Sequence, residues 1–304
     1  MQLTGTVNPS LTTEGVQWIS SNTSVAIVSD SGLVTAKASG TATITFKNSS
    51  GTKSATCKIT VLEDNIVLGT SKGYLDKYDS NGNKLWSRQY INQYLYTDAI
   101  NAVATDLNEN IIVGTGKGYL DKYDGNGNKL WSTQYINQYL YTDAINIVVT
   151  DLNENIIVGT NNGYLDKYDS NGKKLWSTQY INQYLYTDAI NTVATDSSGN
   201  IIVGTNKGYL DKYDSNGKKL WSTQYINQYL YTDAINTVAT DSSGNIIVGT
   251  NKGYLDKYDS NGKKLWSTQY INQYLYTDTI NAVAAGTCSS SGHHSSDDDD
   301  DDDD

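Results

Sequence analysis

Several residue types are almost missing from this chain of 304 residues, which has one proline, one methionine, one phenylalanine, two histidines and two cysteines. Two cysteines are too few for a disulfide scaffold. His293 and His294 stand together near the C-terminus, so neither a cysteine–histidine metal site nor a Ser/His/Asp catalytic set is expected. No apolar run approaches the roughly 20 residues that cross a bilayer, which excludes a membrane span of that kind.

The net charge of −11 comes mainly from one end of the chain, because 297–304 is an unbroken run of eight aspartates. Without this run, 25 acidic side chains stand against 22 basic ones. The rest of the protein therefore has no basic surplus for phosphate backbones, and we expect no nucleic-acid partner. We expect 287–304 to be a disordered acidic tail, extended by repulsion between its like charges.

A repeat of 45 residues dominates the chain. All 25 tyrosines belong to it, five in each copy, and segments 161–205 and 206–250 differ only where Asn162 is replaced by Lys207. One unit is thus repeated five times, and 1–64 form a different domain. The repeat is marked, without insertion or deletion, by Trp86, Trp131, Trp176, Trp221 and Trp266.

Each unit is predicted to form four short strands. Gly and Asn in the connecting segments, as in Asn216-Gly217, supply the positive φ of tight hairpin turns, and β-branched or aromatic residues fill the strands. A helix is disfavoured because no apolar pattern keeps a period of 3.6 residues. In one copy the predicted strands are 189–195, 201–205, 209–213 and 219–225.

Four antiparallel strands in a repeat of this length are typical of a β-propeller blade. The first copy starts at Asn65 on a second strand, and the last copy ends with the missing first strand, 279–284. We therefore predict an all-β fold in which 65–286 form a five-bladed β-propeller closed by the C-terminal strand, with no free edge. Closure predicts a monomer, and an open or domain-swapped assembly is the alternative.

The motif Gly-Tyr-Leu-Asp-Lys-Tyr-Asp-Ser-Asn-Gly-Asn-Lys-Leu-Trp-Ser at 73–87, with Asp-Ser-Ser-Gly-Asn-Ile-Ile-Val-Gly-Thr at 196–205, resembles the bacterial β-propeller repeat family. It is also similar to quinoprotein propellers, which share the Gly-Tyr, Asp, Gly and Leu-Trp skeleton. The resemblance covers 65–286 and implies a propeller but no single activity. A quinone would need asymmetric ligands that these repeats lack, so no cofactor is expected.

Residues 16–61, which begin Val-Gln-Trp-Ile-Ser and end Ala-Thr-Cys-Lys-Ile-Thr-Val, resemble the group 2 bacterial immunoglobulin-like domain. Alternation of Cys57, Ile59 and Val61 with polar neighbours independently predicts a half-buried strand. The resemblance implies an immunoglobulin-like β-sandwich over 1–64 that lacks the family's usual first strand. It also implies a spacer on cell-surface or phage proteins, and hence an extracellular or surface location, although the chain shows no secretion signal.

The longest loop of each unit, 89–98 in the first copy, carries the candidate ligand-binding residues. Tyrosine rings stack on sugars and Asn and Gln amides bond hydroxyls, so five such loops on one rim are a candidate carbohydrate platform. The alternative is that Tyr90, Leu95 and one other tyrosine fill the gap between blades. The candidate binding residues are Asn92, Gln93, Tyr94, Tyr96, Tyr139, Tyr141, Tyr184, Tyr186, Tyr229, Tyr231, Tyr274 and Tyr276.

An aspartate precedes each predicted innermost strand, and these five could ring a tunnel mouth and hold a hard cation such as calcium. The alternative is that each caps a turn by accepting from backbone N–H groups. The segment 79–83 mimics the start of a calcium loop, but a plain hairpin turn is expected there. The candidate metal ligands are Asp98, Asp143, Asp188, Asp233 and Asp278.

Cys57 and Cys288 flank the repeats and would be neighbours after ring closure, so a bridge between them is open. The place of Cys57 in an apolar alternation favours a core thiol instead.

These features predict a non-enzymatic, extracellular binding module with a glycan or a surface protein as its partner. Its overall affinity would be raised by multivalent binding. Catalysis is not expected, because glycosidases need two carboxylates in different environments and near-identical repeats offer no distinguished pair. The alternative is a purely structural scaffold or a protein–protein interaction module with no small-molecule site.

Overall fold

The computed structural model describes residues 1–4, 15–61, 65–89, 98–135, 142–180, 187–225, 232–270 and 278–285. All regular elements in these ranges are strands, so the predicted all-β class is confirmed for this part of the chain. Accordingly, no helix capable of crossing a membrane occurs in the same ranges. The chain divides into two compact units, Met1–Leu68 with Leu75–Arg88, and Gly69–Tyr74 with Gln89–Asp304.

The N-terminal region forms two small antiparallel sheets, of strand order β1-β4-β5 and β2-β3. Alternate residues of β5 turn inward as predicted, and Ile59 and Val61 pack against a core that includes Ile44. Cys57 is half-buried and free, whereas Cys288 lies outside the described residues. The strands are β1 Val16–Ser20, β2 Ala26–Val28, β3 Val34–Ala36, β4 Gly40–Asn48 and β5 Ser54–Val61.

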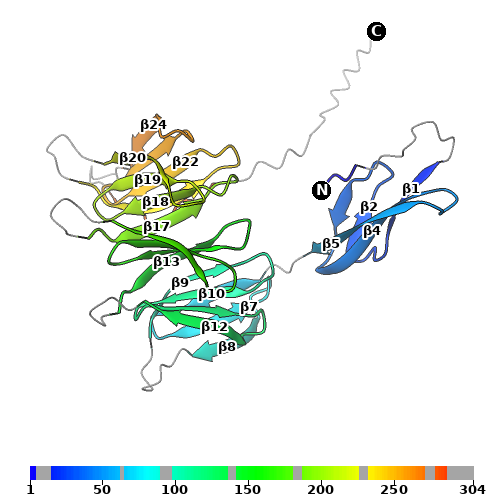
Figure 1. Ribbon diagram of the computed structural model, residues 1–304, viewed down its shortest axis with the longest axis horizontal. Coiled ribbons are helices and arrows are strands. Elements are labelled where there is room, and N and C mark those ends of the chain that lie inside the picture. Colours follow the sequence, from blue (N-terminus) through cyan, green and yellow to red (C-terminus); the bar gives the residue numbers. More distant parts are fainter. Residues whose placement is uncertain are drawn as a thin grey trace, which may run out of the picture. The chain divides into compact units, whose positions relative to one another are not determined.

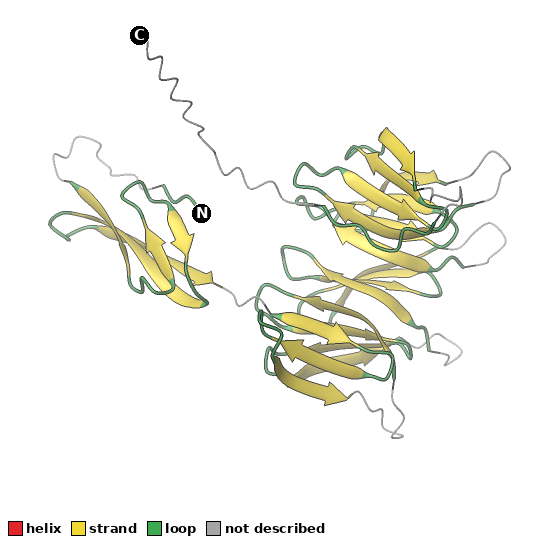
Figure 2. Cartoon of the chain, turned by 180° about the vertical axis from the view of Figure 1, so that it is seen from behind, coloured by secondary structure: helices red, strands yellow, loops and turns green. Residues whose placement is uncertain are grey.

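The repeats form one antiparallel sheet each, which we call the first to fifth blades (Figures 1 and 2). The second to fifth blades have four strands in sequence order, as predicted, and the first has three. The first blade comprises β6 Ile66–Gly69, β7 Tyr74–Tyr78 and β8 Lys84–Gln89. The second comprises β9 Ile100–Thr105, β10 Ile111–Thr115, β11 Tyr119–Tyr123 and β12 Lys129–Gln134, and the third β13 Ile145–Thr150, β14 Ile156–Thr160, β15 Tyr164–Tyr168 and β16 Lys174–Gln179. The fourth comprises β17 Ile190–Thr195, β18 Ile201–Thr205, β19 Tyr209–Tyr213 and β20 Lys219–Gln224, and the fifth β21 Ile235–Thr240, β22 Ile246–Thr250, β23 Tyr254–Tyr258 and β24 Lys264–Gln269.

The hydrophobic core lies between successive blades. One cluster joins Ile157 and Leu165 of the third blade to Ile190 and Val203 of the fourth. Gly204 is the close-approach point in β18, because a Cβ there would come within 2.4 Å of Cγ2 of Ile235 in the fifth blade. Each such glycine lets the first strand of the next blade lie directly on the blade before it.

The predicted closure is not formed among the described residues. Sheet β6-β7-β8 has no fourth strand, and 278–285 form no strand. The segment instead rests on the fifth blade, where the Ile280 N–H donates to the Thr250 carbonyl at 3.0 Å. The Val283 N–H donates to the Thr237 hydroxyl at 3.2 Å, as Val238 does to Thr192 one blade earlier. It therefore lies on the fifth blade as Val238 and its strand lie on the fourth.

Candidate functional site

The predicted loop residues fall outside the described part of the chain. This holds for Asn92, Gln93, Tyr94, Tyr96, Tyr139, Tyr141, Tyr184, Tyr186, Tyr229, Tyr231, Tyr274 and Tyr276. The structure does describe the tyrosine directly after the fourth strand of several blades, at the repeat position of Tyr90, and this strand-end tyrosine leads to the candidate site.

This strand-end tyrosine fills the gap between two blades. Tyr180 is 9% exposed, and its hydroxyl donates to Asp211 Oδ2 of the fourth blade at 2.9 Å. Tyr225 makes the same bond to Asp256 of the fifth blade at 2.7 Å. The ring of Tyr180 also meets that of Tyr213 edge-on, with centroids 6.4 Å apart. The packing interpretation offered for Tyr90 therefore holds at Tyr180 and Tyr225, whereas Tyr90 itself lies outside the described residues.

The aspartate that receives this bond is the centre of a polar cluster. Asp211 also accepts from the Ser222 hydroxyl and from the Lys219 ammonium. The Lys219 ammonium lies over the rings of Tyr180 and Tyr213, 5.2 and 5.3 Å from their centroids. Burial opposes the charge on Lys219, but its bond to Asp211 outweighs burial and raises its pKa. The cluster therefore holds a paired charge beside aromatic faces.

A pocket of about 550 Å³ opens between the fourth and fifth blades beside the fifth-blade copy of this cluster. Its wall combines aromatic faces with amide and ammonium groups. The side-chain amides of Gln224 and Gln269 are oriented there by donating to the carbonyls of Lys207 and Lys252, at 3.0 and 2.9 Å. The lining includes Gln224, Tyr225, Tyr254, Tyr258, Lys264 and Gln269.

Four of the five aspartates before the innermost strands act as turn caps. Asp188 Oδ1 accepts from the Lys207 N–H at 3.0 Å, in the turn between β18 and β19. Asp98, Asp143 and Asp233 accept in the same way from Lys117, Asn162 and Lys252, whereas Asp278 accepts from its neighbour Thr279. Burial raises the pKa of Asp143, Asp188 and Asp233.

The metal hypothesis gains no support in the described ranges, which contain no group of three or more His, Cys, Asp or Glu side chains that could hold an ion. The turn at 79–83 is a plain hairpin turn, as predicted: Asp79 Oδ1 accepts from the Asn81 and Asn83 N–H groups at 2.9 and 2.8 Å.

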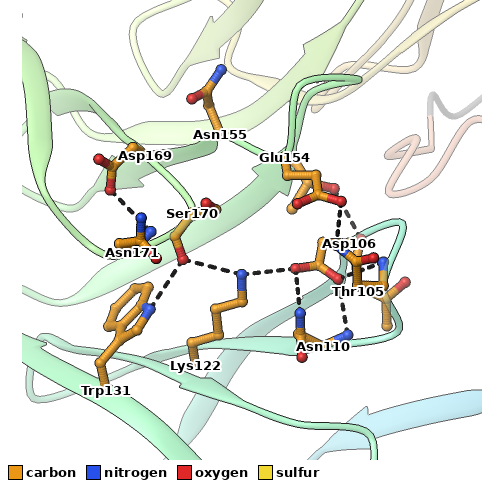
Figure 3. Close-up of polar contacts among 12 residues, drawn as sticks. Thr105, Asp106, Asn110, Lys122, Trp131, Glu154, Asn155, Asp169, Ser170 and Asn171 are labelled. Carbon is orange, nitrogen blue, oxygen red and sulfur yellow. Dashed lines mark hydrogen bonds and ion pairs between the residues drawn. The ribbon is translucent and has the colours of Figure 1, made fainter.

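A second repeated arrangement joins the blades, and sequence reasoning missed it (Figure 3). The Lys122 ammonium lies between Asp106 Oδ2, at 2.8 Å, and the Ser170 carbonyl of the next blade, at 3.1 Å. The Trp131 indole N–H donates to the same carbonyl at 3.2 Å. We call this set the interblade clasp. Its signal in the sequence was a lysine in the third strand of every copy with a tryptophan nine residues later.

The clasp recurs at the next two joints. Lys167 and Trp176 donate to the Ser215 carbonyl at 3.2 and 3.1 Å, and Lys212 and Trp221 donate to that of Ser260 at 3.0 and 3.2 Å. Each lysine is also paired with the aspartate of its own blade. The lysine charge is therefore neutralised inside the joint.

Comparison with known proteins agrees with the fold of the N-terminal region and with that of the repeats. Residues 1–59 match the model of the Bacterial Ig-like domain (group 2). This region is an immunoglobulin-like domain. No curated protein is similar in sequence to the chain.

The repeats are similar in structure to solved proteins of low sequence identity. Sqt1 from Chaetomium thermophilum has a TM-score of 0.55 and 15% identity, with 76% of this chain and 68% of Sqt1 covered. BamB from Moraxella catarrhalis has a TM-score of 0.51 and 17% identity, with 68% of this chain and 62% of BamB covered. A protein of unknown function from Bacteroides caccae has a TM-score of 0.51 and 12% identity, with 67% and 72% covered. These likenesses show a propeller-like fold.

Proposed function

We propose that this protein is a non-enzymatic binding module of the bacterial cell surface whose repeated blades bind carbohydrate at the joints between them. The observation that carries the proposal is the pocket between the fourth and fifth blades, with its tyrosine faces and oriented amides. A pocket of this size and mixed lining suits a small polar ligand. The group 2 Ig-like match at 1–59 supports a surface location.

The charge balance of the pocket favours a neutral, hydroxyl-rich ligand. Lys264 is paired with Asp256 at 2.5 Å, and the other two charged residues of the lining, Lys252 and Asp233, are of opposite sign, so the pocket has no surplus positive charge to attract an anion. The ring of Tyr254, which is half-buried and lines the pocket, can contact the C–H side of a sugar ring. Sugar hydroxyls can then bond the amides at the pocket wall.

The same pairing speaks against catalysis. Asp256 accepts from Lys264, Ser267, Tyr225 and Tyr258, so its oxygens are already engaged. Such a carboxylate is held in place and is a poor nucleophile or base. We therefore propose binding without turnover. The alternative, a scaffold or protein-interaction module, needs no occupant in the pocket.

A glycan array followed by calorimetry on the best ligand tests the proposal. Tyr254 lines the pocket, whereas Tyr74 holds the same repeat position in the first blade and is 41% exposed. We expect Tyr254→Ala to weaken binding at least about tenfold, the loss of about 1.4 kcal/mol of contact, and Tyr74→Ala to leave it unchanged. A blank array, or equal loss in both variants, would favour the scaffold.

The closed five-bladed ring stays a prediction of the sequence. The proposed binding does not depend on it, because the pocket lies between two consecutive blades that are joined within the chain.

A further inference from the structure

The pocket between the fourth and fifth blades is lined by two glutamines that hold the same position in consecutive repeats. Gln224 ends β20 of the fourth blade, and Gln269 ends β24 of the fifth. Both side chains are half-buried. Each amide donates to a carbonyl in the turn between the second and third strands of its own blade, at 3.0 and 2.9 Å. Each of the two blades therefore contributes one oriented amide to the same pocket.

The second and third blades hold a glutamine at this position in the same way. The amide of Gln134 donates to the Lys117 carbonyl at 3.1 Å, and that of Gln179 donates to the Asn162 carbonyl at 2.9 Å. Both of these side chains are also half-buried. Four consecutive blades thus present an amide in one orientation at one repeat position.

The other groups of the pocket wall recur at the two preceding joints. Tyr254, which lines the pocket, has half-buried equivalents in Tyr164 and Tyr209. At each joint a lysine ammonium lies over one tyrosine ring from each blade, between 5.0 and 5.3 Å from the ring centroids. Each of these ammonium groups is paired with an aspartate of its own blade. The three lysines are Lys174, Lys219 and Lys264.

This repetition makes Gln224 a residue of two joints. Toward the fifth blade, Gln224 lines the pocket from the preceding blade. Toward the third blade, it holds the repeat position that Gln269 holds in the pocket. Gln179 stands in the same way between the joint that precedes the third blade and the joint that follows it. Binding sites at consecutive joints therefore adjoin at a shared glutamine.

We infer that the carbohydrate is a linear polysaccharide that lies across at least two consecutive joints and crosses from one to the next at Gln179 and Gln224. The inference rests on the proposed function, because it names the kind of carbohydrate that the joints bind. Sheets that pack face to face lie about 10 Å apart, so a few linked sugar rings can reach from one joint to the next. Once one joint is occupied, binding at the second becomes intramolecular, which raises the affinity without any new kind of contact.

Calorimetric titration of the full chain with oligosaccharides of increasing length tests the inference. The probes are linear oligomers of glucose, mannose, galactose and N-acetylglucosamine, each series beginning at the monosaccharide. For the sugar that binds, we expect the affinity to rise by roughly 100-fold once the oligomer reaches a second joint. The number of ligand molecules bound per chain should fall at the same length, because one molecule then occupies more than one joint.

The length series separates this inference from the proposed function. Binding of a monosaccharide whose affinity and stoichiometry do not change with length would overturn the polysaccharide and leave carbohydrate binding in place. Absence of binding in all four series would overturn both. The series uses the unaltered chain, so its outcome does not depend on the folding of any variant.

Two matched variants test the shared glutamine directly. Gln224→Ala removes an amide that belongs to two joints, whereas Gln269→Ala removes the same group from one joint of the described blades. For an oligomer that spans two joints, we expect Gln224→Ala to weaken binding at least about tenfold more than Gln269→Ala, because only the former interrupts the path between joints. Melting temperatures equal to that of the unaltered chain confirm that both variants fold. Equal losses of affinity for the long oligomer would overturn the inference.

Discussion

Trp176 donates its indole N–H to the backbone carbonyl of Ser215 at 3.1 Å, across the joint between the third and fourth blades. The ammonium of Lys167 donates to the same oxygen at 3.2 Å. One carbonyl thus receives a neutral and a charged donor from the preceding blade. Because charge-assisted bonds are the stronger kind, this shared oxygen is a main polar link between blades.

The lysine of the clasp should matter most where it is buried. Lys212→Met removes the partner of Asp196, whose side chain is 5% exposed, and leaves an uncompensated buried charge. We expect a loss of about 3–5 kcal/mol in the free energy of unfolding. Lys257→Met, at the partly exposed fifth-blade pair, should cost only about 1 kcal/mol. Chemical denaturation of both variants measures the two losses, and equal losses would contradict the clasp.

The glycine that lies on the tryptophan gives a second test. Gly217→Ala and Gly199→Ala both place a side chain at positive φ, 83° and 75°. Only the Gly217 variant brings a Cβ against Trp176, at 2.8 Å. We expect it to be less stable than Gly199→Ala by about 1–3 kcal/mol, the usual range for overpacking. Thermal unfolding of the pair measures the difference, and similar melting temperatures would show that the turn can move away from the indole.

The hydroxyl of the strand-end tyrosine should contribute to stability only inside the array. Tyr180→Phe removes a buried bond to the Asp211 carboxylate and should cost about 1.5–3 kcal/mol. Tyr270→Phe is the matched change at a 60% exposed position and should be nearly neutral. Denaturant titration of both variants measures the two losses. A large loss in Tyr270→Phe would mean that its hydroxyl already has a partner.

Lowering the pH should weaken the bonds that the aspartates of the clasp make, because it protonates their carboxylates. Burial opposes ionisation of Asp241, but bonds from Asn245 and Lys257 outweigh it and lower its pKa from 3.8 to about 2. The pKa values of Asp106, Asp151 and Asp196 are lowered in the same way. A folded-state pKa below the unfolded value stabilises above about pH 4, and this stabilisation is lost as the pH falls toward about 2.

For three of the turn-capping aspartates, Asp143, Asp188 and Asp233, the shift in pKa has the opposite sign. Burial raises the pKa of Asp188, so its contribution is fully present below the unfolded pKa and is lost as the pH rises through the folded value. We therefore expect Asp241→Asn to flatten the fall of melting temperature below about pH 4 and Asp188→Asn to leave that fall in place. Unchanged acid dependence in Asp241→Asn would assign the fall to other carboxyls.

The strands of each blade were predictable because their signals are local. Segments 201–205 and 209–213 are strands as predicted, since a glycine-containing turn and β-branched or aromatic residues specify a hairpin without help from the rest of the chain. The turn-capping chemistry of Asp188 was also foreseen as one of two alternatives. Its partner, Lys207, became identifiable only in the folded blade.

The interblade contacts were harder to foresee because they depend on two blades at once. Asp121 and Lys122 are adjacent and both buried, which breaks the alternation expected of a half-buried strand. Asp121 accepts from Lys129 and Ser132 of β12, whereas Lys122 joins Asp106 of its own blade to Ser170 of the next. Ring closure depends on the rotation between successive blades, which no single repeat determines. The loop residues proposed for ligand binding stay a prediction.

Because the clasp recurs with the same residues, one blade can replace another in the array. At the three joints from the second blade to the fifth, a lysine and a tryptophan donate to a serine carbonyl at the same positions of consecutive copies. Removing 206–250 in one piece would bring Lys167 and Trp176 against a turn with the same sequence as the one they lose. A chain shortened or lengthened by whole repeats should therefore fold with all of its joints intact, so protein length can change in steps of one blade without redesign of the core.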